Sequence, residues 1–344
     1  MNTKRHTTRD SSKIRVAHIG AGRMGRRWVS VLSKSRIAQL TTIVDHGSGE
    51  AQKLAAPIPG CSATQDIESV LRDPSIDAVI VSTPHRNLSE ISLAALTAHK
   101  HVLCEKPGAL TSAEIKHNVD LAKKMKLTYM IGYNHRFHDG FLKARKEYEK
   151  GTIGEIIFIR ARYGFGGRKG YNTEWRLNPA QSGGGHLIDQ GVHMIDLVLS
   201  YIGKPQKIEG VRSDTFWKKG SEDNAFVLLQ GGKKQTASIH TSLTQWKPMH
   251  SFEIYGSKGY LEVQGLGMKY GGSEKLIIGK RAQDFSGEVK EHIVECNSVA
   301  DDSLVLELEE FVSAIKEKRE PSPSPLEAYE TLKVVETVYR KNKL

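Results

Sequence analysis

The sequence contains few cysteines and no long apolar run, and these absences exclude two classes of protein. No apolar stretch in the 344 residues approaches the roughly 20 residues of a membrane-spanning helix. The three cysteines, Cys61, Cys104 and Cys296, lie far apart without CxxC spacing, which indicates neither a disulfide framework nor a cysteine metal site. We therefore expect a soluble protein without a membrane partner, located by default in the reducing cytoplasm.

The positive charge is unevenly distributed, which argues against a nucleic-acid partner. The formal net charge is +11, but the first 13 and the last 12 residues each carry four basic residues against one acidic residue. No recognised nucleic-acid motif accompanies the charge, which we interpret as solubility with a bias toward anionic ligands. Residues 1–12 are polar and lack the apolar centre of a secretory signal, so we expect a disordered basic tail there.

A glycine-rich turn follows the first apolar run. Residues 13–19 form that run, GAGRMG occupies positions 20–25, and a helical pattern begins after it. GxGxxG between a strand and a helix is typical of dinucleotide binding, because the glycines let the backbone approach a pyrophosphate at the helix N-terminus. A purely structural strand-to-helix turn is the alternative. The expected cofactor contacts in this turn are Gly20, Gly22, Arg23, Met24 and Gly25.

An acidic residue after the second apolar run predicts which dinucleotide binds. The run at 40–44 ends in Asp45, twenty residues beyond Gly25. A carboxylate at this place accepts hydrogen bonds from the adenosine ribose hydroxyls and repels a 2′-phosphate. No arginine stands in the adjacent positions to bind that phosphate. We therefore expect NAD(H) rather than NADP(H).

Strand and helix patterns keep alternating up to residue 131. This alternation predicts a doubly wound parallel sheet, in which each helix connects two neighbouring strands. Further strands are expected at 78–81, 102–104 and 128–131, and helices at 66–71, 87–98 and 111–124.

Two segments of this region should lie at the carboxyl ends of strands, where such sheets bind their ligands. Pro107 restrains Lys106 to an extended backbone, which should project the ammonium group from the strand end. That group could bind a cofactor phosphate, pair with Glu105 or polarise a substrate oxygen, although a surface lysine is the commoner case. The strand-end residues that we expect to contact the cofactor are Thr83, Pro84, His85, Glu105 and Lys106.

A glycine-rich segment at 182–185 leads into a mostly apolar helical pattern with one narrow polar stripe. At about 100° per residue the stripe spans roughly 120°, and it should face a cleft or a polar network. Asp189 lies one turn before His193, so we expect its carboxylate to orient the imidazole, raise its pKa and create a proton acceptor. A satisfied core histidine is the alternative; a metal site of His186, Asp189 and His193 matches no standard zinc signature, and we expect no metal. The stripe consists of His186, Asp189, Gln190, His193 and Asp196.

Taken together, these motifs resemble the glucose-fructose oxidoreductase/inositol dehydrogenase (Gfo/Idh/MocA) family. GAGRMG, Asp45, STPH at 82–85, EKP at 105–107 and GGGHLIDQGVHMIDL at 183–197 occur in the order and spacing of that family. The resemblance covers nearly the whole chain after Lys13. It implies a two-domain NAD(P)-dependent oxidoreductase acting on sugars, cyclitols or sugar derivatives, with a second domain built on a large, mostly antiparallel open sheet.

The resemblance also assigns roles to individual residues. The family's EKP lysine falls on Lys106, and its inositol-dehydrogenase-like Asp and His fall on Asp189 and His193, where many sugar-active relatives carry Tyr in place of the His. A Trp-Arg pair that approaches the nicotinamide in some relatives matches Trp175 and Arg176. His193 would then accept a hydroxyl proton while hydride leaves for the nicotinamide, and Lys106 would polarise the oxygen.

The second half of the chain predicts an antiparallel, meandering sheet with one uncovered face. Burying that face against a copy of itself predicts a homodimer or homotetramer. Strands are expected at 155–162, 207–212, 225–229, 236–243, 252–255 and 260–263, and helices at 138–150, 304–316 and 325–340. The expected domains are a dinucleotide-binding Rossmann domain at 13–134, a substrate and oligomerisation domain at 135–320, and a closing C-terminal helix at 321–344.

A basic segment in this half bears on the substrate. Positions 160–176 contain five basic residues and one acidic residue, Glu174. This excess of positive charge would suit an anionic substrate such as a nucleotide sugar or a sugar acid; solvated charge is the alternative. The basic residues are Arg160, Arg162, Arg168, Lys169 and Arg176.

Three functions compete on these observations. The leading hypothesis is an NAD(H)-dependent dehydrogenase or reductase acting on a secondary hydroxyl or ketone of a small sugar-like molecule. The others are a glycoside hydrolase that uses NAD in a transient oxidation and a non-catalytic NAD-binding sensor. A sensor has no need of Lys106, Asp189 and His193 together.

Overall fold

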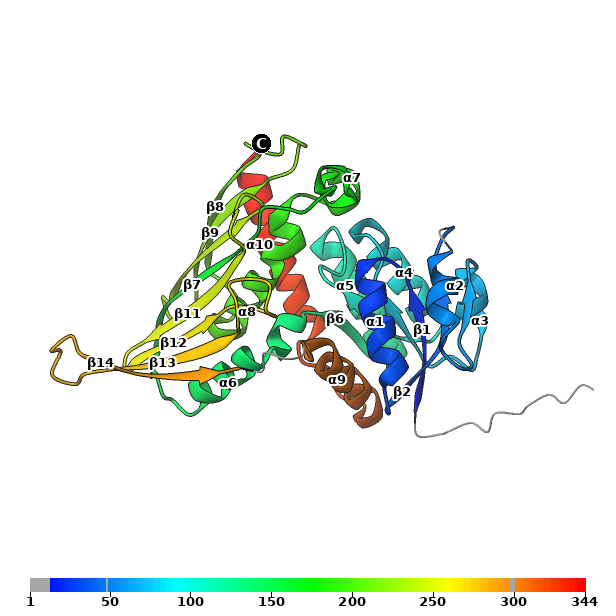
Figure 1. Cartoon of the computed structure of the whole chain (residues 1–344), viewed down its shortest axis with the longest axis horizontal. Coiled ribbons are helices and arrows are strands. Elements are labelled where there is room, and N and C mark those ends of the chain that lie inside the picture. Colours follow the sequence, from blue (N-terminus) through cyan, green and yellow to red (C-terminus); the bar gives the residue numbers. More distant parts are fainter. Residues whose placement is uncertain (1–12, 48, 297–300) are drawn as a thin grey trace, which may run out of the picture.

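Two sheets with helices between them form the protein (Figure 1). The structure is a computed structural model that describes residues 13–47, 49–296 and 301–344, so the expected tail at 1–12 lies outside the described residues. The predicted fold class, a doubly wound parallel sheet followed by a large, mostly antiparallel sheet, is confirmed. In the described part of the chain, no helix has both the length and the apolar character needed to cross a membrane.

The N-terminal sheet has six parallel strands in the order β3-β2-β1-β4-β5-β6. Its central strands form because they are continuous apolar runs, and every residue of β4 is buried. The strand order reverses between β1 and β4, which creates the crevice where sheets of this kind bind ligands. The strands are β1 (Ile14–Ile19), β2 (Ala38–Val44), β3 (Ser62–Thr64), β4 (Ala78–Val81), β5 (His101–Glu105) and β6 (Tyr129–Gly132). The helices are α1 (Arg23–Lys34), α2 (Glu50–Ala55), α3 (Ile67–Arg72), α4 (His85–Thr97) and α5 (Ser112–Met125).

The C-terminal sheet has eight strands in the order β14-β13-β12-β11-β7-β10-β9-β8. The expected meander is interrupted, because β7 lies between β11 and β10 and pairs with β10 in parallel. The last two strands were not predicted; β14 is almost entirely exposed and largely charged, so it lacks the apolar alternation that marks a strand. The strands are β7 (Ile156–Gly164), β8 (Lys207–Ser213), β9 (Asn224–Gln230), β10 (Thr236–Ser242), β11 (Met249–Gly256), β12 (Gly259–Gln264), β13 (Lys275–Arg281) and β14 (Val289–Glu295).

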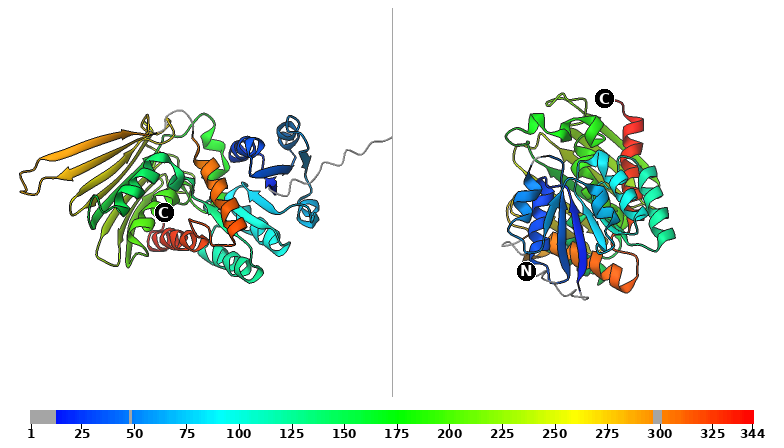
Figure 2. Two further views of the ribbon diagram at one scale, coloured as in Figure 1. Left: turned by 90° about the horizontal axis from the view of Figure 1, so that it is seen from below. Right: turned by 90° about the vertical axis from the view of Figure 1, so that its right-hand side faces the viewer.

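Helices cover only one face of this second sheet. α6 (Asp139–Glu149), α8 (Val192–Ile202) and α10 (Pro325–Lys341) lie between it and the N-terminal sheet (Figures 1 and 2). α9 (Ser303–Glu317) comes from the C-terminal end of the chain but shares a hydrophobic cluster with α1 and the N-terminal sheet. The connecting short elements are η1 (Asn134–Phe137), η2 (Tyr171–Thr173), η3 (Trp175–Leu177), α7 (Pro179–Ser182) and η4 (Leu187–Gly191).

Candidate functional site

In the first turn, Gly20 and Gly25 lie where a side chain would not fit, whereas the space beside Gly22 is open. Gly20 has φ +105°, and a Cβ there would lie 2.8 Å from the carbonyl oxygen of Ser82. A Cβ on Gly25 would lie 1.9 Å from the carbonyl oxygen of Gly20. At Gly22 a Cβ would meet nothing within 4 Å. The first two glycines are therefore required by the fold, whereas Gly22 keeps the approach to α1 open for a ligand.

A buried histidine on β1 supports the turn from beneath. His18 Nε2 lies 2.9 Å from the carbonyl oxygen of Gly20, and the hydroxyl of Ser82 donates to the same oxygen at 3.1 Å. Burial lowers the pKa of His18 to about 4, so the ring stays neutral. This role could not be predicted, because a single His in an apolar strand has no distinguishing pattern.

The start of α1 is suited to an anionic group. Its N-terminus has no side-chain cap and no acidic residue in the first turn, so the helix dipole and the free amides there favour a phosphate. Asp45, directly after β2, accepts a hydrogen bond from the amide of Ala21 at 3.0 Å, which fixes its carboxylate beside the turn. The glycine turn, the N-terminus of α1 and the carboxylate of Asp45 together fit a dinucleotide.

The three residues of EKP point in different directions. Glu105 is buried and accepts a hydrogen bond from the indole nitrogen of Trp28 at 2.8 Å, and burial raises its pKa. Lys106 instead extends toward the second half of the chain, and its peptide bond to Pro107 is cis. The structure thus separates a glutamate that packs beneath α1 from a lysine that reaches the site.

Lys106 and Asp189, 83 positions apart in the chain, form a buried ion pair. The ammonium group lies 3.0 Å from Asp189 Oδ1 and also donates to the backbone carbonyl oxygen of Asp189. Two further groups approach the carboxylate: Arg176 Nε is 3.4 Å from Oδ2, and His85 Nε2 is 3.5 Å from Oδ1. Burial alone would raise the pKa of Asp189, but Lys106, Arg176 and His85 hold it well below its ordinary value. Asp189 is therefore a carboxylate at neutral pH.

His193 lies close to this pair, but the predicted bond between Asp189 and His193 is absent. Within the described residues Asp189 makes no hydrogen bond to His193, whose Nδ1 is buried without a partner. The expectation of a raised pKa is also wrong: burial and the charge of Lys106 lower the pKa of His193 well below its ordinary value, and Asp189 only opposes this. Asp189 lies in η4, a π-helical turn from Leu187 to Gly191, and its carboxylate is held there by Lys106, Arg176 and His85 instead.

The other members of the expected polar stripe do not face one cleft. Asp196 is fully buried and receives two hydrogen bonds from Arg136, at 2.7 Å from Nε and 2.6 Å from Nη2. His186 is buried with neither ring nitrogen bonded, and burial lowers its pKa to about 4. Among the described residues, no group of three or more His, Cys, Asp or Glu side chains is placed to hold a metal ion.

The glycine-rich segment before η4 packs against a buried carboxylate that no sequence pattern predicts. Glu222 Oε1 accepts from the amides of Gly185 and Leu187, both at 3.0 Å, and from the hydroxyl of Tyr339 at 2.6 Å. A Cβ on Gly185 would lie 2.0 Å from the backbone oxygen of Glu222. Glu222 therefore holds the start of the π turn and needs glycine opposite it.

The basic segment is partly neutralised by ion pairs. Arg160 and Arg162 lie on the uncovered face of the second sheet and approach Glu253, at 2.5 Å and 4.0 Å. In the loop, Arg168 and Arg176 share Glu174, at 2.5 Å and 3.2 Å. These four arginines therefore share two glutamates, which reduces the free positive charge that the segment offers.

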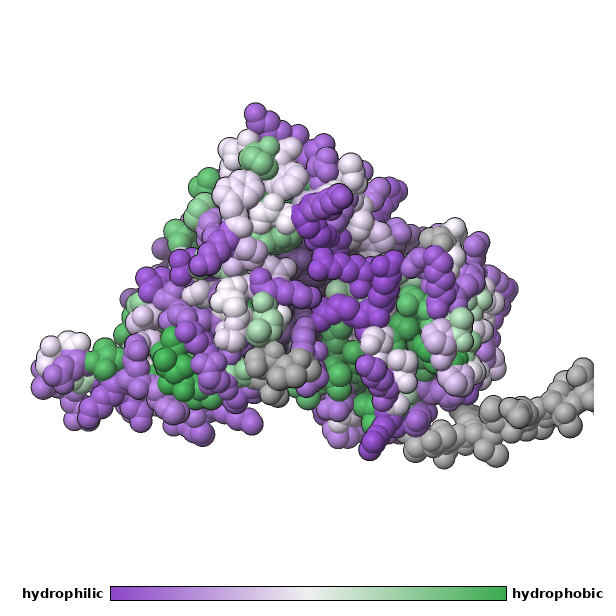
Figure 3. All heavy atoms as spheres, in the orientation of Figure 1, coloured by the Kyte–Doolittle hydropathy of each residue, from purple (hydrophilic) through white to green (hydrophobic). Residues whose placement is uncertain are grey.

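Aromatic rings surround His193 on the side of the second sheet. His135 stacks on it with ring centroids 3.7 Å apart and an 8° interplanar angle, and His250 and Tyr163 contact His135 at their edges. His250 is buried, and burial lowers its pKa to about 3. The surface is hollowed between the two halves of the molecule and mainly hydrophilic residues surround the hollow (Figure 3). Uncharged rings thus lie beside the Lys106–Asp189 pair.

Both halves of the chain match models of known protein families. The model described as the oxidoreductase family, NAD-binding Rossmann fold, matches residues 14–133, and the GFO/IDH/MocA C-terminal domain matches residues 141–262. A levoglucosan dehydrogenase in complex with NADH has the same fold, with a TM-score of 0.85 at 22% identity over 96% of this chain and 98% of that chain.

Two similar sequences are dehydrogenases by name. D-glucoside 3-dehydrogenase of Escherichia coli strain K12 is 32% identical over 215 residues, which is 62% of this chain and 60% of that protein. Levoglucosan dehydrogenase of Pseudarthrobacter phenanthrenivorans is 32% identical over 154 residues, 44% of this chain and 40% of that protein. Both matches span less than two thirds of the relative's own length. Because both halves match in order, the chain belongs to the Gfo/Idh/MocA family of oxidoreductases, and its N-terminal half is that family's NAD-binding Rossmann fold.

Proposed function

We propose that this protein is an NAD(H)-dependent dehydrogenase or reductase that acts on a secondary hydroxyl or ketone of a neutral sugar or cyclitol. The observation that carries the proposal is the convergence of Lys106, Asp189 and His193 from separate parts of the chain. The first two form a buried ion pair, and the charge of Lys106 reaches His193 strongly enough to lower its pKa.

Each of the three residues has a role that follows from its surroundings. Bound nicotinamide would accept or return hydride at C4. His193, held neutral by its lowered pKa, can accept the hydroxyl proton. Lys106 would donate a hydrogen bond to the substrate oxygen and stabilise its developing negative charge. Asp189 would position the ammonium group of Lys106 through the 3.0 Å contact to Oδ1.

The charges around the site favour a neutral substrate over the nucleotide sugar or sugar acid considered from the sequence. Arg176 pairs with Glu174 and Asp189, and Arg168 pairs with Glu174. The rings of His135, His193 and His250 all have lowered pKa values because they are buried, so they offer uncharged donors and acceptors suited to hydroxyl groups. The names of D-glucoside 3-dehydrogenase and levoglucosan dehydrogenase point to the same class.

The placement of Asp45 supports NAD(H) as the preferred form of the cofactor. Its carboxylate is fixed beside the turn by the amide of Ala21, where it would oppose a 2′-phosphate. The rings of Trp175 and His85 meet edge-on with centroids 4.8 Å apart, and the guanidinium of Arg176 lies over the Trp175 ring. Arg176 also contacts Asp189, which supports a position of the Trp175–Arg176 pair near the nicotinamide.

A substrate panel with matched variants tests the proposal. Glycosides, aldoses, cyclitols, uronates and nucleotide sugars would be assayed with NAD and with NADP by following absorbance of the reduced nicotinamide. We expect turnover of a neutral substrate with NAD, a loss of about 100-fold or more in His193→Ala and Lys106→Ala, and no change in His117→Ala, an exposed histidine on α5. Full turnover in the first two variants would contradict the assigned roles.

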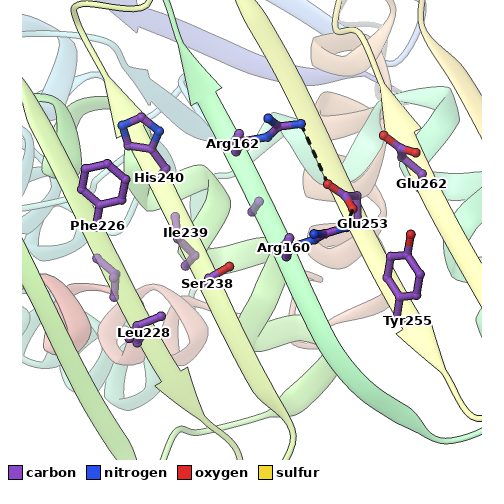
Figure 4. Close-up of a pocket in the computed structure, with 12 residues that line it drawn as sticks. Arg160, Arg162, Phe226, Leu228, Ser238, Ile239, His240, Glu253, Tyr255 and Glu262 are labelled. Carbon is purple, nitrogen blue, oxygen red and sulfur yellow. Dashed lines mark hydrogen bonds and ion pairs between the residues drawn. The ribbon is translucent and has the colours of Figure 1, made fainter.

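We further propose that the uncovered face of the second sheet joins two copies of the chain. Phe226 and Leu228 on this face are more than half exposed, and Figure 4 shows Phe226 beside His240 and Leu228 beside Ser238 on the neighbouring strand. Burying such apolar surface favours self-association. Light scattering after size exclusion should give at least twice the 38.2 kDa chain mass, and Leu228→Glu should shift the protein toward the monomer. A wild-type monomer at micromolar concentration would refute this.

The cysteines support a reducing compartment, for which we propose the cytoplasm. Cys61, Cys104 and Cys296 are all free thiols. Burial raises the pKa of Cys104 to about 12 and that of Cys61 to about 11, so neither is a reactive thiolate.

A further inference from the structure

Among the described residues, no group is hydrogen-bonded to Nδ1 of His193 to orient the proposed proton acceptor. A catalytic histidine is usually held by a carboxylate or a carbonyl oxygen at its second nitrogen. Here Nδ1 of His193 is buried without a partner, and Asp189 is committed to Lys106, Arg176 and His85. Another contact must therefore fix the plane of the ring.

His135 supplies a flat surface against that ring. The two imidazoles are stacked face to face, with centroids 3.7 Å apart and planes 8° apart. Tyr133, two residues earlier in the chain, meets His193 edge-on at 5.9 Å and an interplanar angle of 86°. The ring of His193 is thus confined by one face and one edge rather than by a hydrogen bond.

An ion pair between the same two elements fixes the register of the stack. Arg136, the residue after His135 on η1, binds Asp196, which lies three residues after His193 on α8. A second ion pair joins Arg136 to Glu327 on α10, at 2.9 Å. Because η1 is tied to α8 and α10 at this neighbouring position, the ring of His135 is presented to His193 in one orientation.

The surroundings of the stacked rings prevent both His135 and His193 from being protonated at once. Burial, with His193 next in effect, lowers the pKa of His135 well below its ordinary value, so His135 stays neutral when His193 takes up a proton. Lys106, His138 and His250 also oppose a positive charge on His193, whereas Asp189 favours it. A neutral aromatic face stabilises a cation placed over it. The titratable and charged groups facing the pair are His138 after η1, Tyr133 after β6, Tyr163 on β7, His250 on β11, Lys106 after β5 and Asp189 on η4.

We propose that His135 is a positioning residue for His193: its stacked ring fixes the plane of the proton acceptor and stabilises the imidazolium that forms when the substrate hydroxyl loses its proton. The proton passes from the hydroxyl to His193 and remains there, and His135 takes no part in its transfer. This inference rests on the proposed dehydrogenase function.

Two substitutions separate the effect of an aromatic face from that of volume. His135→Phe keeps a flat ring, and His135→Leu fills the space without one. We expect the Leu variant to lose about tenfold or more in kcat with KM for NAD within twofold of wild type. Its acid limb of the kcat/KM profile should move to lower pH, because an imidazolium without its aromatic face loses its proton more readily. The Phe variant should keep kcat within threefold and an unshifted limb.

A measurement that needs no substrate tests the same idea. In the wild type and the Phe variant, the ring protons of His193 should show upfield ring-current shifts and a single set of NOEs to Tyr133. In the Leu variant the shifts should vanish and the NOEs should weaken or multiply. Unchanged NOEs in the Leu variant, or a folded Phe variant that is inactive, would overturn the inference. Absence of turnover on every panel substrate with the expected NOE pattern would instead count against the dehydrogenase function alone.

Discussion

Asp189→Asn is the substitution that most directly tests the arrangement around Lys106. Asparagine retains the volume and one acceptor oxygen but removes the negative charge that faces Lys106 and Arg176. Both cations are largely buried, with 10% and 19% of their side chains exposed. The variant therefore leaves two positive groups directed at an uncharged one.

The cost follows from the burial of the pair. Removing one partner of a buried ion pair costs about 3–5 kcal/mol, and we take about 3 kcal/mol because the amide oxygen still accepts a hydrogen bond. At about 2.1 cal/mol/K per residue, unfolding of the 344 residues has an entropy of roughly 0.7 kcal/mol/K. The melting temperature should therefore fall by about 4 °C. Turnover should fall by about 100-fold, since Lys106 loses the group that positions it.

The stability that Asp189 contributes should depend on pH in a definite direction. The pKa of folded Asp189 lies well below its ordinary value, mainly because Lys106 and Arg176 outweigh the opposing effect of burial. A depressed pKa adds stability that is complete above the unfolded value of about 3.9 and is lost as the pH falls toward the folded value. The difference in melting temperature between wild type and Asp189→Asn should accordingly be full at pH 7 and narrow below about pH 4.

Calorimetry across pH, combined with steady-state kinetics, measures both effects. Asp223→Asn is the matched control, because Asp223 is equally buried but accepts hydrogen bonds from the amides of residues 215–217 rather than from Lys106. It should lose stability and keep its turnover. An Asp189→Asn protein with the wild-type melting temperature, or with a difference that does not change with pH, would refute the reasoning.

Three further substitutions follow from the packing. Gly22→Ala should leave the melting temperature unchanged, since its Cβ meets nothing within 4 Å, while the KM for NAD rises about tenfold or more because the methyl group occupies the approach to α1. Gly185→Ala should lower the melting temperature by about 4 °C in calorimetry, because a Cβ 2.0 Å from the backbone of Glu222 forces a shift that costs about 3 kcal/mol. Trp28→Phe should lower the urea-derived unfolding free energy by about 1–3 kcal/mol, because the buried carboxyl of Glu105 loses its indole donor.

Much of the fold could be predicted because its signals are local. The segment at 78–81 is a strand with every residue buried, and a continuous apolar run of this length admits few other structures. The glycines at 20 and 25 are required by contacts within their own turn and with Ser82. The GxGxxG motif therefore predicts the turn from local contacts. By contrast, β14 is held by backbone pairing with β13. Its charged and exposed side chains show no pattern that predicts this pairing.

The site was predicted less completely, because its critical contacts join distant segments. Glu222 acts on Gly185 and Leu187 through side-chain oxygens, and a lone Glu before a strand has no pattern that marks such a role. His135 and Arg136 were passed over for the same reason, since their partners are on α8. The strand-end position of Lys106 and the spacing of Asp189 and His193 pointed to these residues, and the resemblance to a family supported them. Neither showed which of the three contact one another.

The error over Asp189 and His193 shows where a spacing argument fails. A spacing of four residues places two side chains on one helical face, but it does not show which charged groups from distant segments bind the carboxylate there. Nor does anything in GHLIDQGVH mark the π turn from Leu187 to Gly191. That turn is fixed from outside, by Glu222 at its start. Because the carboxylate of Asp189 faces Lys106, it positions the ammonium group, and the imidazole of His193 depends on an aromatic neighbour for its orientation. A substrate hydroxyl placed between Lys106 and His193 would then meet a positive donor and a neutral acceptor, which is the combination that oxidation of an alcohol requires.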